Sequence, residues 1–97
     1  MKMVMMVIDE ARKEELEIVL EDAGVAGYTE LSRASGLGTT GPRLGSRAFP
    51  KTSAVIFTVL SAEALVNLRA TLRAFCRDCG ERLKMIAWDV EDIEVAP

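Results

Sequence analysis

The residues of this chain that could do chemistry gather in one glycine-rich stretch, Gly36 to Pro50 (GLGTTGPRLGSRAFP). It holds four of the seven glycines and two of the three prolines, with Arg43 and Arg47 and no acidic residue, although the net charge of the chain is −3. Glycines let backbone N–H groups approach an anion closely, and arginine stays charged at physiological pH. A connection of this length predicts a flexible, cationic, functional loop.

The loop alone leaves three interpretations open: an anion or nucleotide site, a mobile interaction loop, and a disordered filler segment. The pair Gly36-x-Gly38 with Gly41 is a weak signal, because no helix follows the glycines as a Walker A or dinucleotide motif requires.

Cys76 and Cys79 form a C-x-x-C pair in the last turn of a predicted helix. Such a pair can be a redox couple or half of a thiolate metal site. The chain has no histidine and no second C-x-x-C to complete a zinc site, and a helix C-terminus raises a thiol pKa instead of lowering it. Packing is therefore the expected role of the pair, and a thiol redox switch remains the alternative.

Catalysis is not predicted, because no histidine and no nucleophile-base arrangement is present. The carboxylates of residues 89–94 could bind a hard cation weakly, but a solvated strand end explains them as well. We therefore expect neither an enzyme nor a metal site.

Hydrophobic periodicity predicts the elements that position these residues. Apolar side chains on both faces indicate buried strands, and apolar stripes at helical spacing indicate helices, with Asp9 and Ser61 as N-caps and Gly24 and Gly80 as stops. The expected strands are 3–8, 27–35, 53–60 and 84–88, and the expected helices are 10–23 and 62–79. This order predicts an α+β domain over residues 1–97 with the ferredoxin-like split βαβ (βαββαβ) fold: a four-stranded antiparallel sheet with two helices on one face.

The face of the sheet away from the helices is predicted to be apolar, because both parities of strands 3–8 and 53–60 carry Met, Val, Ile or Phe. A soluble monomer should not expose such a surface, so we expect a homo-oligomer. Phe75 and Trp88 are expected in the core.

Composition limits the partners and the location. With 49% hydrophobic and 28% charged residues the chain should be soluble and globular, and its mild acidity and few aromatic residues argue against nucleic acid. The apolar start, MKMVMMVI, is too short for a membrane span and lacks a cleavage site. A cytoplasmic protein with reduced thiols is expected.

The chain resembles the PII signal-transduction (nitrogen regulatory protein) superfamily over nearly its whole length. The most specific part is the first third, where Met1-Lys2, a strand, an amphipathic helix, Gly24, Gly27 and Thr29 fall in the family's register without a gap. A Gly-x-Gly at a loop base, a long loop, Pro-Lys, an apolar strand, a helix and a Val-Glu-Asp-Ile follow in the family's order.

This resemblance implies trimers that bind adenine nucleotides in clefts between subunits. The loop 36–50 would be the effector loop that reaches a transporter or an enzyme, and a membrane would be contacted only through such a partner. The implied function is a regulator that binds a small anionic metabolite and controls a target protein through its loop.

Taken position by position, the resemblance places Thr29, Gly36, Gly38 and Val59 in the nucleotide cleft and Lys84 where a phosphate-contacting lysine stands. Thr40 occupies the place of a loop-base glutamine that serves a dicarboxylate ligand. The family's Gly-Asp-Gly is replaced by residues 81–83, Glu-Arg-Leu, and its Arg-x-Arg beyond the last strand is absent. AMP, ADP or another small anion is therefore expected ahead of ATP, although Arg43 or Arg47 could fold back and substitute for the lost arginines. The full predicted ligand set is Thr29, Gly36, Gly38, Thr40, Arg43, Arg47, Val59 and Lys84.

Two alternatives remain beside this function. The group borders on CutA-like divalent-ion trimers, which would need a metal site here. The second alternative is a redox-responsive regulator acting through Cys76 and Cys79.

Overall fold

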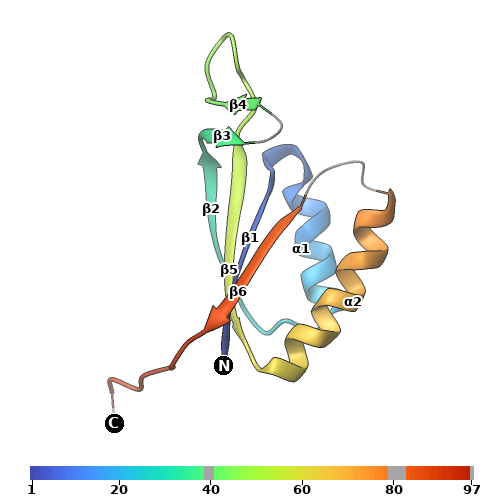
Figure 1. Ribbon diagram of the computed structural model, residues 1–97, viewed down its shortest axis with the longest axis vertical. Helices are drawn as coiled ribbons and strands as arrows, with labels where there is room; N and C mark the ends of the chain where they lie inside the picture. The colour runs from blue at the N-terminus through green and yellow to red at the C-terminus, as the bar shows by residue number, and fades with distance from the viewer. Residues whose placement is uncertain (39–40, 79–82, 97) are drawn as a thin grey trace.

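A computed structural model describes residues 1–38, 41–78 and 83–96, except for the side chains of 76–78. Figure 1 shows a sheet with two helices beside it and a long loop projecting from one end. The elements in chain order are β1 (Lys2–Asp9), η1 (Glu10–Arg12), α1 (Lys13–Asp22), β2 (Thr29–Ala34), β3 (Gly36–Gly38), β4 (Gly41–Arg43), β5 (Ser53–Leu60), α2 (Ala62–Asp78) and β6 (Lys84–Asp89).

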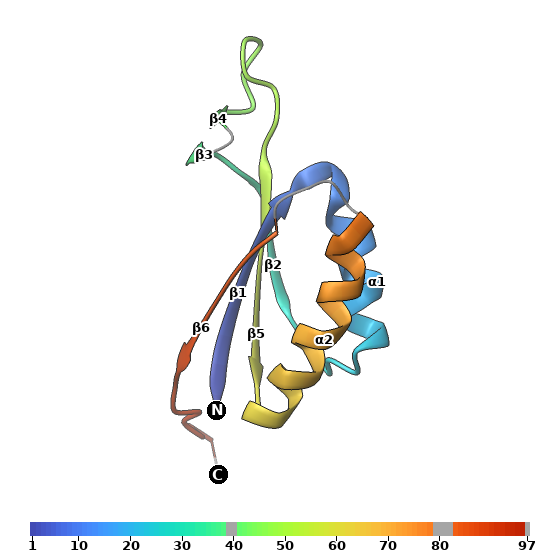
Figure 2. The ribbon, with the colours of Figure 1, turned by 45° about the vertical axis from the view of Figure 1, so that its right-hand side comes forward.

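The main sheet has four antiparallel strands in the order β2-β5-β1-β6. Both helices cover the same face, and Figure 2 shows the opposite face without cover. The predicted ferredoxin-like α+β fold is therefore confirmed. The long loop leaves the sheet at the edge where β1 and β2 end and β5 and β6 begin, which we call the loop end.

The core lies between the sheet and the helices. Because successive strand residues point to opposite faces, one alternate set of each central strand faces the helices, and α1 and α2 contribute apolar side chains from one stripe each. The buried apolar residues are Val4, Met6, Ile8, Leu16, Leu20, Ala54, Ile56, Leu60, Leu68 and Leu72. Burial of each large side chain stabilises the fold by about 1.5–3 kcal/mol.

The helix ends follow the predicted caps. The Asp9 side chain accepts a hydrogen bond from the Ala11 N–H (3.0 Å). The turn that Asp9 caps is the 3₁₀ helix η1, whereas the sequence predicts an α-helix from residue 10. At the other end of α1 the Val25 N–H donates to the Leu20 carbonyl around Gly24, whose φ is 77°. This is the αL stop of a Schellman motif. The Ala64 N–H donates to the Ser61 hydroxyl at the start of α2 (3.1 Å), and Gly80, its predicted stop, lies outside the described residues.

The face away from the helices, which we call the open face, is apolar as predicted. Its half-buried or exposed side chains come from all four strands: Met3, Met5, Val7, Leu31, Val55, Phe57, Val59, Ile86 and Trp88. Leu31 is 55% exposed and Trp88 is 43% exposed. The prediction that Trp88 lies in the core is wrong, because alternation along β6 places it opposite Met3 on this face. Phe75 packs partly buried against the core, as predicted.

Candidate functional site

The base of the glycine-rich loop is a small two-stranded sheet. β3 and β4 pair antiparallel, with Gly36 opposite Arg43 and Gly38 opposite Gly41, whose φ of 104° favours glycine. An irregular loop was predicted here, and the sequence did not reveal this hairpin. Thr40, one of the predicted ligand residues, lies outside the described residues.

The tip of the loop is closed by its own backbone. The N–H groups of Leu44 and Ser46 both donate to the Phe49 carbonyl, at 3.3 and 3.1 Å, and the Ser46 hydroxyl accepts from the Phe49 N–H. The side chains of Leu44 and Phe49 are nevertheless 51% and 44% exposed. The tip therefore presents apolar side chains beside exposed Arg47.

Arg43 does not project into solvent. Its Nη1 lies 3.1 Å from the Asp9 carboxylate and 3.5 Å from the Thr52 carbonyl, and the two charged side chains are only 18% and 8% exposed. Burial alone would raise the pKa of Asp9, but the Ala11 N–H and the Arg43 guanidinium outweigh it, so the pKa lies below its ordinary value. No sequence pattern indicated that Asp9, predicted only as a helix cap, also binds the loop.

Arg47 differs from Arg43 in its surroundings. Among the described residues no ion pair or side-chain hydrogen bond involves Arg47. Lys51, which follows the loop, is also exposed and adds to the positive charge that acts on Asp9. The loop thus keeps cationic charge available for an anion or an acidic partner.

Lys84 lies at the loop end of the sheet, near these charges. It is exposed at the start of β6, opposite Val7 on the open face. Asp9 is two residues beyond Val7, so Lys84 and Asp9 are diagonal neighbours with Cα atoms about 7–8 Å apart. Lys84, Arg43 and the Gly36–Gly38 strand therefore gather at the loop end, which brings part of the predicted ligand set together.

Val59 lies at the opposite end of the same face, and Thr29 lies in its middle row, opposite Phe57. They line a shallow pocket of about 240 Å³ between β2, β5 and β1. The Thr58 hydroxyl donates to the Gly27 carbonyl at 2.6 Å, which fixes the rim of the pocket. The pocket is lined by Met3, Gly27, Tyr28, Thr29, Phe57, Thr58 and Val59.

The predicted ligand residues thus form two groups in one chain. Val55 lies in the same row of the sheet as Lys84, and Val59 is four residues farther along β5. Four residues of strand span about 13 Å, so Val59 is at least that far from the row of Lys84. Strand β2 separates Thr29 from the loop base by at least as much. The structure does not unite the two groups within one chain.

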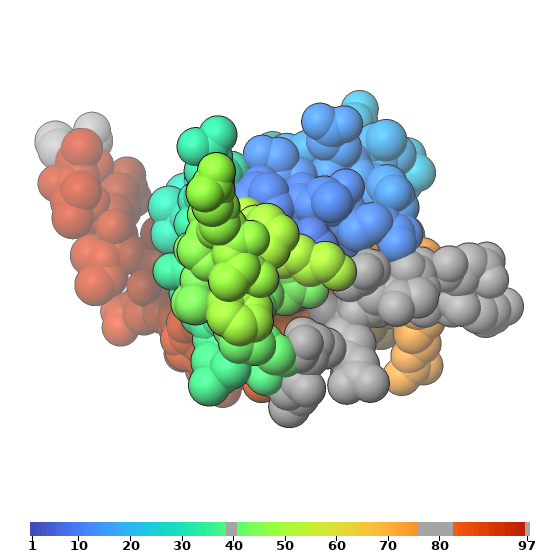
Figure 3. Space-filling model, turned by 90° about the horizontal axis from the view of Figure 1, so that it is seen from above, coloured from blue at the N-terminus to red at the C-terminus, as the bar shows by residue number. Residues whose placement is uncertain are grey.

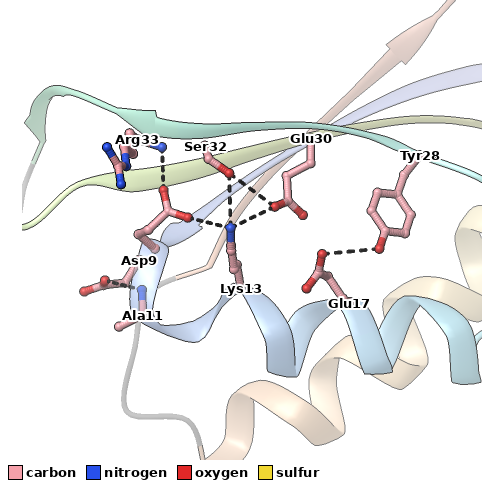
Figure 4. Close-up of polar contacts among 9 residues, drawn as sticks. Asp9, Ala11, Lys13, Glu17, Tyr28, Glu30, Ser32 and Arg33 are labelled. Carbon is pink, nitrogen blue, oxygen red and sulfur yellow. Dashed lines mark hydrogen bonds and ion pairs between the residues drawn. The ribbon is translucent and has the colours of Figure 1, made fainter.

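A polar cluster fixes the point at which β2 turns into the loop (Figure 4). The Lys13 ammonium lies 3.1 Å from the Glu10 carboxylate and 3.4 Å from that of Glu30, and it donates to the Ser32 hydroxyl at 3.1 Å. The other Glu10 oxygen accepts from the Arg33 N–H, a bond that lowers the pKa of Glu10.

Arg33 has a φ of 57°, in the left-handed region, at a β-bulge of β2. Leu31 pairs with Val55 but Ala34 pairs with Ser53, so one extra residue is inserted on the β2 side. The bulge moves Ala34 onto the open-face row that Arg33 would otherwise occupy. This sets the direction in which the chain enters β3. The sequence predicts a regular strand over residues 27–35 and does not indicate the bulge.

Two predicted features concern metals and thiols. Among the residues with described side chains, no group of three or more His, Cys, Asp or Glu could hold a metal ion. Cys79 lies outside the described residues, and Cys76 is in α2 with its side chain outside them.

Within the part of the chain that the structure describes, neither helix is long and apolar enough to cross a membrane.

Comparison with protein families gives one match. The family model described as nitrogen regulatory protein P-II matches residues 1–96. A comparison with curated proteins gives no significant match.

Solved structures share the fold. CPII, a nitrogen regulatory PII-like protein from Thiomonas intermedia K12, was solved bound to ADP, AMP and bicarbonate. It superposes with a TM-score of 0.69 at 23% identity over 92% of this chain and 86% of its own. Its structure with ADP and bicarbonate gives a TM-score of 0.69 at 24% identity over 92% of this chain and 86% of its own. A PII-like signaling protein from Thermus thermophilus gives 0.65 at 16% identity, with 92% and 85% coverage.

Proposed function

The chain belongs to the nitrogen regulatory protein P-II family, and we propose that it is a non-enzymatic regulator that binds a small anionic metabolite between its own subunits. An adenine nucleotide, AMP or ADP ahead of ATP, is the proposed ligand. The long loop carries the response to a target protein.

One observation carries this proposal: the predicted ligand residues form two separate groups on one exposed sheet face. Thr29 and Val59 line the pocket, whereas Lys84 and the Gly36–Gly38 strand lie at the loop end, more than about 13 Å away. A second copy packed on the open face can bring the loop end of one subunit to the pocket of its neighbour. The site would then be complete only in the assembly.

The apolar open face supports that assembly. Each of its three rows contains apolar side chains from adjacent strands, and the middle row runs Thr29, Phe57, Met5 and Ile86. A surface of this kind is typical of an interface between subunits. Because members of the family are typically trimers, we propose a homotrimer.

The chemistry of the loop end favours an anion. Lys84 is exposed on the open face, and Arg47 and Lys51 are exposed in and just after the loop. The likeness to CPII, which was solved with ADP, AMP and bicarbonate, makes these three molecules the first probes. The exposed Leu44 and Phe49 at the loop tip give the loop an apolar surface for a partner protein, a transporter or an enzyme.

Isothermal titration of the purified assembly with ADP, AMP, ATP and bicarbonate tests the proposal. A lost charge-assisted hydrogen bond costs about 1.5–3 kcal/mol, so Lys84→Ala should weaken nucleotide binding about 10- to 100-fold. Arg73→Ala removes the same charge from an exposed position on α2 and serves as the control.

The expected result is micromolar or weaker binding of AMP or ADP that Lys84→Ala weakens by that factor and Arg73→Ala leaves unchanged. If none of the four probes binds the wild-type assembly, the sensor function is wrong. If both variants bind like wild type, the loop-end half of the site is wrongly placed.

A further inference from the structure

The Asp9–Arg43 ion pair occupies the point where the loop meets the sheet. Asp9 is the last residue of β1 and Arg43 the last residue of β4, and their side chains approach to 3.1 Å. Among the described residues this is the only ion pair between the loop 36–50 and the rest of the chain. Figure 3, seen from the loop end, shows the loop standing beside the blue segment that follows β1.

The pair is better shielded from water than an ordinary surface ion pair. Asp9 is 8% exposed and Arg43 is 18% exposed, whereas the Lys2–Asp89 pair at the other end of the sheet leaves Asp89 84% exposed. Exposed ion pairs contribute little to stability, but breaking a shielded pair leaves a partly buried charge uncompensated. Asp9 also accepts from the Ala11 N–H, so its carboxylate is fixed in place for Arg43.

Asp9 is surrounded by positive charge. Arg43 contacts it, Lys51 acts on it at longer range, and Lys84 is its diagonal neighbour on the sheet. The next carboxylate along the chain, Glu10, is already engaged by Lys13 and the Arg33 N–H. The Asp9 carboxylate therefore lies where the positive charge of the loop end would attract an anion. It already pairs with the Arg43 guanidinium, which such an anion would otherwise bind.

We propose that Asp9 is an internal competitor of the ligand anion: it holds Arg43, and with it the base of the loop, until a phosphate group of the ligand takes Arg43 over. The inference rests on the proposed function, whose anion site it extends with a regulatory step. A phosphate group presents more acceptor oxygens and more charge than a carboxylate and binds a guanidinium in the same forked geometry. Exchange of Arg43 from Asp9 to phosphate would free the β4 strand from β1 and so change the loop that meets the partner.

Two consequences follow from this competition. Removing the charge of Asp9 should free the loop without ligand, and it should also strengthen anion binding, because the two effects are linked through the same guanidinium. A purely structural ion pair would give the first effect without the second.

Asp9→Asn is the appropriate variant, because asparagine keeps the size and the acceptor oxygen for the Ala11 N–H and loses only the charge. Asp89→Asn is the matched control, since Asp89 also ends a strand and pairs with a lysine at 2.7 Å, but away from the loop. The measurements are the rate of trypsin cleavage after Arg47, followed by mass spectrometry, and the Kd for ADP and for inorganic pyrophosphate.

We expect Asp9→Asn to be cleaved about tenfold faster than wild type without ligand and to bind ADP and pyrophosphate about tenfold more tightly. Wild-type protein saturated with ADP should be cleaved as fast as the variant, and Asp89→Asn should match wild type throughout. If Asp9→Asn does not fold, Arg43→Gln breaks the same pair from the loop side and should also accelerate cleavage after Arg47.

Different outcomes overturn different claims. If ADP binds wild type but Asp9→Asn shows unchanged affinity, or neither the variants nor ADP change the cleavage rate, the competition is wrong while the proposed function stands. If neither ADP nor pyrophosphate binds wild type or Asp9→Asn, both the competition and the anion-sensing function are wrong.

Discussion

Replacement of Met5 by aspartate should dissociate the proposed assembly. Met5 lies on β1, in the middle row of the open face, between Phe57 on β5 and Ile86 on β6. Its side chain is half-buried in the isolated chain, so a carboxylate there can reach solvent while the subunit is free. In the assembly the same carboxylate would be buried against an apolar neighbour.

The expected size of the effect comes from burying the charge. An uncompensated buried charge costs about 3–5 kcal/mol, and a trimer would bury three of them, roughly 9–15 kcal/mol in total. Since each 1.4 kcal/mol is about tenfold in an equilibrium constant, the trimer association constant should fall by at least about six orders of magnitude.

Light scattering at micromolar concentration measures the result. Wild type should have three times the 10.6 kDa mass of one chain, and Met5→Asp should have the mass of one. Ala70→Asp puts the same charge on an exposed position of α2 and should remain trimeric. Circular dichroism checks that the variant subunit keeps its fold.

A Met5→Asp protein that stays trimeric would show that the open face is not the interface, and a wild-type monomer or dimer would refute the trimer itself. A variant that loses its helices would instead show that Met5 supports the subunit fold, contrary to its place on the open face.

Two further predictions concern stability. The neighbouring Glu30 carboxyl raises the pKa of Glu17 above its ordinary value of 4.5, so the Glu17 contribution to stability is present below pH 4.5 and lost as the pH rises through its folded-state pKa. Glu17→Gln should therefore stabilise the fold at pH 7, by less than about 1 kcal/mol because the site is half-exposed, and the gain should disappear at pH 4. Thermal melting at both pH values measures this, and an equal gain at both would contradict it. Thr58→Val removes the 2.6 Å hydrogen bond to the Gly27 carbonyl from a position that is 4% exposed and should cost about 1–2 kcal/mol. An unchanged urea midpoint would exclude this role.

The layers of the fold were predictable because hydrophobic periodicity is a local property. The alternation along β1 and β5 and the stripe on α2 each appear within one segment, and the caps at Asp9 and Ser61 are set by single side chains. Their order then leaves few ways to form an antiparallel sheet.

The features at the loop end depend on contacts between distant segments. Arg43 finds Asp9 across 34 residues, and the bulge at Arg33 is held by Glu10 across 23. The residues of these two pairs are the same types as ordinary surface charges, so no local sequence pattern indicates which residues pair. Trp88 was misplaced for a related reason, because an aromatic side chain suits a core and an interface equally.

The candidate site was predictable only in part. Thr29, Val59 and Lys84 were proposed through a resemblance and lie on one face, but their separation into two groups became visible only with the strand register. The sequence also could not show that Arg43 is already paired with Asp9.

Mixed assemblies of two inactive variants test the shared site most directly. Lys84→Glu should disable the loop-end half and Thr29→Glu the pocket half, and neither homotrimer should bind ADP. If equal amounts of the two variants are mixed and reassemble at random, about three quarters of the trimers contain both variants. Each of these mixed trimers has one junction between subunits at which both halves of the site are intact. We expect titration of the mixture to recover about a quarter of the wild-type number of ADP sites. If the mixture recovers none while both variants still form trimers, the site is not built between subunits.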